Sequence, residues 1–141
     1  MIAEKKIKGR KKHIIVDTLG PLLGCHITTA NISDKLGFIE ILDMFYLPCI
    51  QKLWADQGYS GWDLERICAD KGIIMEVVKR QEEGFKLLKK RWIVERTFSW
   101  MNRNRRLSKD YETLPKTTQN WCYISMIRLM IKRVESSNFS F

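Results

Sequence analysis

The sequence predicts one α/β domain in which helices cover a mixed β-sheet. Two observations lead to this fold class. Short β-rich runs alternate along the chain with stretches of helical periodicity. The composition, 45% hydrophobic with five Trp and only three Pro in 141 residues, suits a single domain with a packed core. No internal repeat interrupts this order.

A β-hairpin followed by a helix is expected near the N-terminus. Residues 13–17 and 22–28 are β-rich, and the Thr-Leu-Gly-Pro stretch 18–21 between them favours a turn. Residues 31–34 offer helix-capping side chains ahead of apolar positions at three- and four-residue spacing. The predicted helix ends before Pro48.

The middle of the chain predicts two further strands with a helix between them. A short strand over 50–55 stops at Asp56, and a glycine-containing loop over 57–61 leads into a helix through 64–68. A second strand covers 73–78. This order places the Asp56 carboxylate at the C-terminal end of a strand.

Two helices close the predicted element order. After a polar loop over 79–84, residues 85–104 have helical periodicity, and so do residues 115–134. In the last helix five apolar residues share one face, which predicts that this face packs on the sheet. They are Trp121, Ile124, Ile127, Ile131 and Val134.

The charge of the chain favours a polyanionic partner, nucleic acid before others. Lys and Arg number 25 against 16 Asp and Glu, a formal charge of +9. A merely solvated basic surface is the competing interpretation, but the charges cluster. Residues 1–12 are interpreted as a basic N-terminal arm that carries Lys5, Lys6, Lys8, Arg10, Lys11 and Lys12. A second cluster comprises Lys86, Lys89, Lys90, Arg91, Arg96, Arg103, Arg105 and Arg106.

The cysteines and the apolar runs exclude several classes of protein. The four cysteines form no CxxC pair, and the two histidines are not spaced with them as zinc ligands. We therefore expect reduced, buried thiols. No signal peptide and no apolar run of membrane-spanning length is present, which predicts a cytoplasmic protein without a membrane partner.

Asp56 and Glu95 are the candidate catalytic residues. Carboxylates from a strand end and a nearby helix can share divalent metal ions that activate water for phosphodiester cleavage. For each residue a plain structural role competes with this hypothesis. Asp56 would be a turn former or helix cap. Glu95, inside an apolar helical window, would form a surface ion pair with Arg91.

Three blocks of the sequence, in the right order, resemble DDE transposases of insertion-sequence families four and five. The first block is KKIKGRKKHIIVDTLG at 5–20, and the second is LWADQGYSG at 53–61. The third is RWIVERTFSWMNRNRRL at 91–107. The resemblance covers nearly the whole chain.

The resemblance implies an RNase H-like mixed sheet flanked by helices, with two Asp and a Glu that bind two Mg²⁺ or Mn²⁺ ions. By position, Asp56 resembles the second Asp and Glu95 the final Glu. Arg91 matches the Arg four residues before that Glu in the family signature. Leu88 and Asn102 depart from the signature, which has Tyr and Lys there, so the DNA-positioning role of those two side chains is not carried over.

No residue matches the first Asp of the family. In the family that Asp lies on the strand before the Lys-Gly-Arg-Lys segment, with which this sequence begins. We therefore expect residues 1–141 to be a partial catalytic domain, truncated at the N-terminus with the first strand missing. Asp17 maps to the hairpin that follows and suits a turn. Whether Asp17 or a partner chain substitutes for the first Asp stays open.

The implied function is DNA transposition, with strand cleavage and strand transfer at insertion-sequence ends. With an incomplete set of ligands, the chain alone is expected to be inactive. A non-catalytic, basic DNA-binding remnant is the alternative, and an unrelated RNA-binding protein lacks a supporting motif. The expected partner is DNA, with a homo-oligomer or an upstream transposase fragment as a second partner. Lys and Arg side chains of both basic clusters would contact phosphate.

Overall fold

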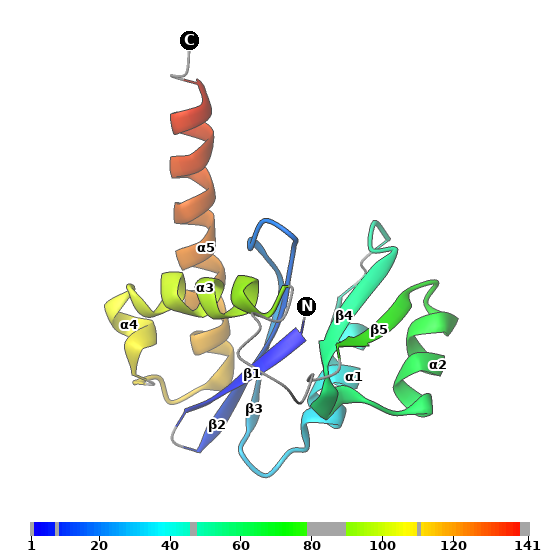
Figure 1. The fold of residues 1–141 in the computed structure, drawn as a ribbon. Helices are drawn as coiled ribbons and strands as arrows, with labels where there is room; N and C mark the ends of the chain where they lie inside the picture. The colour runs from blue at the N-terminus through cyan, green and yellow to red at the C-terminus, as the bar shows by residue number, and fades with distance from the viewer. Residues whose placement is uncertain (1, 8, 46–47, 79–89, 110, 139–141) are drawn as a thin grey trace, which may run out of the picture.

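Five strands form one mixed sheet in the order β3-β2-β1-β4-β5 (Figure 1). The computed structural model describes residues 2–7, 9–45, 48–78, 90–109 and 111–138. The strands are β1 (Ile2–Ile7), β2 (Arg10–Val16), β3 (Leu22–Thr29), β4 (Lys52–Asp56) and β5 (Ile74–Val78). β1, β2 and β3 pair antiparallel, whereas β4 runs parallel to both β1 and β5.

Helices cover both faces of this sheet, so the mixed α/β architecture predicted from the sequence is confirmed (Figure 1). The helical elements are α1 (Asp34–Met44), the 3-10 turn η1 (Gln57–Tyr59), α2 (Trp62–Asp70), α3 (Arg91–Asn102), α4 (Arg105–Ser108) and α5 (Pro115–Asn138). The short α4 was not predicted. The residues expected to begin the α3 helix, 85–89, lie outside the described part of the chain.

Two hydrophobic cores, one on each face, follow from the alternation of side chains along β2. Ile14 and Val16 belong to a core shared with β3, α3, α4 and α5. Ile15 points to the other face, into a core with α1, β4 and α2. All three residues are buried. The β2 strand therefore joins the two layers of helices.

The segment interpreted from its charges as a basic N-terminal arm contains a strand of the sheet. β1 lies in the middle of the sheet, and Gly9, with φ +80°, makes the turn into β2. Backbone pairing explains the difference. Six register pairs, from Ile2↔Ile15 to Ile7↔Arg10, join β1 to β2 and provide hydrogen-bond partners for its backbone. The run of charged residues gave no sign of this strand in the sequence.

The predicted hairpin and first helix are confirmed. The Asp17 and Gly20 amides close the turn by donating to Pro21 O and Asp17 O, each at 2.9 Å. α1 begins after Ser33, whose hydroxyl accepts a hydrogen bond from the Leu36 amide at 3.2 Å. Both elements carry strong local signals, and both appear where the sequence placed them.

The face of α5 that packs on the sheet is not the predicted one. Ile124, Ile127, Ile131 and Val134 are between 50% and 59% exposed. The packed stripe comprises Thr118, Cys122 and Met126, with Trp121, Tyr123 and Leu129 partly buried beside it. The Tyr123 hydroxyl accepts a hydrogen bond from the Cys25 amide of β3 at 2.9 Å. Because α5 extends well past the sheet (Figure 1), much of its apolar surface has no layer to cover it.

Three of the four cysteines are buried as expected, and one is not. Cys25, Cys68 and Cys122 are fully buried free thiols, whereas Cys49 is exposed. Burial raises the pKa of Cys68 to about 11, which keeps that thiol protonated. None of the described helices combines the length and the apolar composition that a bilayer crossing requires.

Candidate active site

Asp56 is the last residue of β4, at the point where the buried strand reaches the surface. Ala55 before it is fully buried, while Asp56 itself is half-buried. One carboxylate oxygen of Asp56 accepts a hydrogen bond from the Gln57 amide at 2.7 Å and caps η1. The structure thus contains the capping role that competed with the catalytic hypothesis, and this role fixes the side chain at the strand end.

Glu95 projects from the outward side of α3. Its neighbours Val94 and Phe98 are buried in the core, which orients the helix, whereas the Glu95 side chain is 68% exposed. Arg91 Nε lies 3.4 Å from Glu95 Oε1, the ion pair that the competing interpretation expected. An exposed pair of this kind contributes little to stability. The carboxylate remains accessible from solvent.

Asp56 and Glu95 line one cavity of about 270 Å³. The other lining residues are Asp34, Gly58, Tyr59, Arg91, Val94 and Phe98. The cavity therefore lies between the end of β4, η1 and the first half of α3. The structure brings together the two carboxylates that the sequence singled out, although 38 residues separate them in the chain.

The hairpin turn between β2 and β3 holds α3 in place. The buried Thr97 hydroxyl lies 2.8 Å from Gly20 O and 2.9 Å from Ile93 O, the two carbonyls to which it can donate. Arg96 Nη2 donates to Leu19 O at 2.8 Å. Because Arg96 and Thr97 directly follow Glu95 in the helix, these bonds also fix the position of Glu95.

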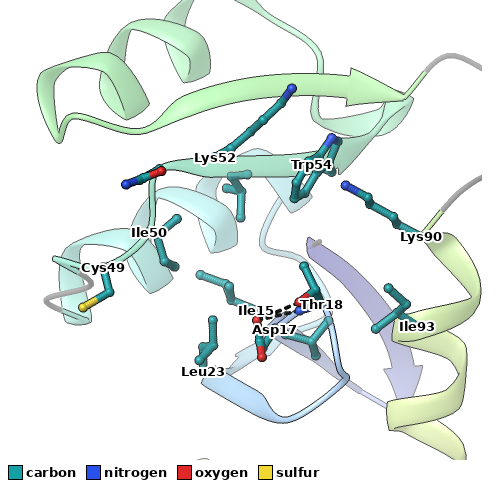
Figure 2. Close-up of a pocket in the computed structure, with 13 residues that line it drawn as sticks. Ile15, Asp17, Thr18, Leu23, Cys49, Ile50, Lys52, Trp54, Lys90 and Ile93 are labelled. Atoms are coloured by element: carbon teal, nitrogen blue, oxygen red, sulfur yellow. Dashed lines mark hydrogen bonds between the residues drawn. The ribbon is translucent and has the colours of Figure 1, made fainter.

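A cation–π contact links the start of α3 to β4. Lys90, in the left-handed conformation with φ 82°, precedes α3 and places its ammonium 2.8 Å from the centroid of a Trp54 ring (Figure 2). Trp54 is two residues before Asp56 on β4. The contact therefore joins the two elements that carry the candidate carboxylates.

Asp34, at the start of α1, is a third carboxylate on the cavity that the sequence did not single out. It forms an ion pair with Lys11 Nζ, which also donates to Ile32 O at 2.9 Å. The capping pattern at 31–34 located the helix start but gave no sign that it would meet the end of β4. Across the described ranges, no three His, Cys, Asp or Glu side chains are grouped closely enough to hold a metal ion.

Asp17 lies away from this cavity. Its carboxylate accepts hydrogen bonds from the Thr18 amide at 2.7 Å and the Thr18 hydroxyl at 3.2 Å (Figure 2). It lines a separate cavity of about 140 Å³ together with Lys52 and Trp54. Asp17 is a turn residue here, as the sequence predicted.

The strand beside Asp56 carries no Asp at the matching position. β1 and β4 are parallel with Ile2 paired to Ala55. Extending this register by one residue brings Ala3 level with Asp56.

In the first basic cluster, the basic side chains that the structure describes form hydrogen bonds or ion pairs within the protein. Lys12 is buried, with Nζ 3.4 Å from Leu107 O, and Lys11 is buried against Asp34. Arg10 donates to the carbonyls of Glu112 and Thr113 at 2.8 and 2.5 Å. These three side chains tie the sheet to its surroundings, which sequence clustering could not distinguish from a free basic surface. The side chains of Lys5, Lys6 and Lys8 lie outside the described part.

The second basic cluster is more accessible. Arg103 and Arg105 are exposed, and Arg106 pairs with Glu112 at 3.3 Å and stacks on Trp121. Arg103 also lines a cavity of about 290 Å³ between α3 and α5 with two cations that the sequence analysis missed, Arg128 and Lys132. Of the two signature departures, Leu88 lies outside the described residues and Asn102 ends α3, half-buried.

Comparison with known sequences decides the family. Residues 2–130 match the profile of the family described as "Transposase DDE domain". The chain belongs to this family. A candidate transposase for insertion sequence element IS402 from Burkholderia cepacia is 34% identical to this transposase domain over 116 residues. The aligned region covers 74% of the chain and 54% of that relative, so the chain spans about half of the relative's length.

A solved structure supports the fold of this transposase DDE domain. The catalytic core domain of BIV integrase superposes with a TM-score of 0.59 at 14% identity, over 89% of this chain and 78% of the integrase chain. The likeness confirms the RNase H-like mixed sheet expected from the resemblance. Membership of the transposase family connects the domain with DNA transposition.

Proposed function

We propose that this domain carries part of the catalytic site for metal-dependent DNA strand cleavage and strand transfer at the ends of an insertion sequence, in the bacterial cytoplasm. The observation that supports the proposal is the shared cavity of Asp56 and Glu95. Two carboxylates from a strand end and a facing helix are suited to phosphodiester chemistry at a divalent ion. Family membership supports the same assignment.

The donor chemistry of the cavity fits Mg²⁺ or Mn²⁺. Mg²⁺ prefers oxygen ligands and is commonly held by one or two carboxylates together with water and substrate phosphate. Asp56 and Glu95 would be those ligands. When bound, the ion would lower the pKa of a coordinated water and stabilise negative charge on the reacting phosphate. A pair of ions would need a further carboxylate ligand. Asp34 lines the cavity but is paired with Lys11, and the described residues contain no group of three His, Cys, Asp or Glu that could hold a metal ion.

Basic side chains around the cavity would hold the DNA backbone. Arg91 lies on the cavity beside Glu95, and Arg103 directly follows the end of α3 and faces α5. Their guanidinium groups can contact phosphate oxygens in pairs of hydrogen bonds. Glu95 would then exchange its ion pair with Arg91 for the metal, which frees Arg91 for phosphate.

A second candidate function is DNA binding without cleavage, and one observation favours it. Ala3 stands where β1 passes Asp56, and Asp17 is held in the hairpin turn. With Asp34 engaged by Lys11, Asp56 and Glu95 are the two carboxylates left as ligands, and the chain alone should not cleave DNA. A second copy of the chain or an upstream transposase fragment would then have to provide the further carboxylate.

A plasmid-nicking assay in Mg²⁺ or Mn²⁺ separates the two functions. The chain itself and its Asp17→Ala variant should leave supercoiled plasmid intact. Ala3→Asp adds a carboxylate level with Asp56 and should produce metal-dependent nicking above background. Adding Asp56→Asn or Glu95→Gln to Ala3→Asp should remove that nicking.

Each outcome favours one function. Nicking that appears with Ala3→Asp and disappears in both double variants supports the catalytic site. A folded, DNA-binding Ala3→Asp protein that never nicks favours the non-cleaving module. Nicking by the unmodified chain that is lost on Asp17→Ala would show that Asp17 is a ligand and would contradict the assignment of this cavity.

A further inference from the structure

Four side chains form an alternating stack along α3. Arg96 lies between two tryptophans, with its guanidinium carbon 4.3 Å from the centroid of Trp92 and 4.7 Å from that of Trp100. Arg133 of α5 continues the stack, 4.4 Å from the Trp100 ring. We call Trp92, Arg96, Trp100 and Arg133 the Trp–Arg stack. Trp92, Arg96 and Trp100 are spaced four residues apart along α3, which puts all three on one side of the helix.

The hairpin turn fixes the middle of this stack. Arg96 donates to Leu19 O at 2.8 Å, and a Cβ on Gly20 would lie 2.8 Å from Trp100. The turn therefore packs closely against both residues. A platform held this way loses little conformational entropy when a ligand stacks on it.

The outer end of the stack is open to solvent and lies beside the candidate catalytic carboxylate. Trp92 is 44% exposed. It follows Arg91, which lines the Asp56–Glu95 cavity, and precedes Glu95 by three residues. Side chains three residues apart on a helix are neighbours, about 5–6 Å apart at Cβ. A group stacked on Trp92 would therefore lie about one nucleotide away from a phosphate held at Glu95.

We propose that Trp92 binds an unpaired DNA base by stacking, next to the phosphodiester that the carboxylate pair would engage. Aromatic rings stack on nucleobases of any sequence, but only on a base whose face is free. Inside a duplex both faces are covered by neighbouring pairs, so the platform selects a frayed, flipped or single-stranded base. The location beside the phosphodiester depends on the proposed function, whereas the stacking itself does not.

The binding test compares single-stranded and duplex DNA in EDTA, where no metal-dependent cleavage can occur. Fluorescence anisotropy would measure the affinity of the chain for labelled oligothymidylate and for a hairpin duplex with the same number of phosphates. Trp92→Ala should weaken single-strand binding about tenfold, the loss of one stacked base, and leave duplex binding within about twofold. Trp92→Phe keeps an aromatic face and should retain most of the affinity.

Trp62→Ala is the matched control. Trp62 is the more exposed tryptophan, at 72%, but lies on α2, away from the Trp–Arg stack. Its removal should change neither affinity. Equal weakening on both substrates by Trp92→Ala, or no weakening on either, would overturn the proposal.

A second readout needs no variant and so does not depend on the folding of Trp92→Ala. A hairpin duplex with 2-aminopurine in a single-stranded overhang should change fluorescence when the chain binds, because the base moves from water onto an aromatic ring. The same base inside the duplex should change little. An overhang signal no larger than the duplex signal would contradict the stacking. Failure of the nicking assay would leave these EDTA measurements unaffected, so the two proposals fail separately.

Discussion

At the scale of single residues, His13 couples the stability of the fold to pH. Burial lowers the pKa of His13 from 6.5 to about 4, because the charged imidazolium is poorly solvated inside the protein. His26 and Lys11 lower it further, while Asp34 and Glu40 act in the opposite direction. The unfolded chain therefore binds a proton between about pH 6.5 and pH 4 that the folded chain does not.

Stability should fall as the pH falls through that window. We expect the free energy of unfolding to decrease by about 2 kcal/mol between about pH 7 and pH 5, because the unfolded chain protonates His13 there and the folded chain does not. Urea unfolding at the two pH values measures the loss. His13→Gln, which keeps a polar group near the Thr28 hydroxyl 2.9 Å away, should reduce the pH dependence by that amount. An unchanged dependence would show that another group carries it.

The sequence singled out two carboxylates that the fold brings to one cavity, but it did not distinguish the roles of the basic residues around them. Asp56 and Glu95 stand in blocks whose order along the chain is readable from sequence. Lys11 and Lys12 have the same charge as a free phosphate-binding lysine, but the fold buries both. Whether a lysine faces DNA or a carbonyl depends on tertiary contacts, about which clustering in the sequence says nothing.

At the scale of elements, the packing of α1 on β2 depends on one glycine. A Cβ on Gly37 would overlap the ring of His13. Overpacking of this kind costs about 1–3 kcal/mol, and the better helix propensity of Ala offsets at most about 1 kcal/mol. Gly37→Ala should therefore lower the free energy of unfolding by roughly 1–2 kcal/mol in denaturant titration. Gly58→Ala, with open space at its Cβ, should change it little; an equal loss in both variants would contradict the packing argument.

Local sequence signals identified most helices and strands, but they did not identify which face of α5 is buried. Its sequence contains two apolar stripes, one with Cys122 and Met126 and one with Ile127 and Ile131. Periodicity shows that the members of a stripe share a face, but not which face a sheet will cover. The central strand β1 is a second case, because its pairing with β2 and β4 is set by backbone register and not by an apolar pattern.

At the scale of the whole molecule, the net charge of +9 predicts DNA binding that depends steeply on salt. Log affinity for duplex DNA should fall linearly with log salt, because bound Lys and Arg release counterions. Replacing the exposed Arg103 and Arg105 with Ala should flatten the slope by about two. Arg66→Ala, on α2, is the control and should leave it unchanged. A slope that the Arg103 and Arg105 changes do not alter would place the DNA elsewhere on the surface.

The sheet itself is divided at the boundary between β1 and β4. Among the described residues, β1 and β2 share six register pairs and β4 and β5 share five, whereas one pair, Ile2↔Ala55, joins β1 to β4. Asp56 belongs to the β4 side of this boundary. Glu95 belongs to the other side, because its helix α3 is bonded to the turn between β2 and β3.

The cavity straddles this boundary, so strand pairing within either half of the sheet does not by itself set the separation of the Asp56 and Glu95 carboxylates. Contacts that cross the boundary set it instead. On one face the buried core joins Ile15 to Leu53 and Ala55, and at the cavity end the Lys90–Trp54 contact ties the start of α3 to β4. The geometry of the carboxylate pair is therefore a property of side-chain packing between the two halves.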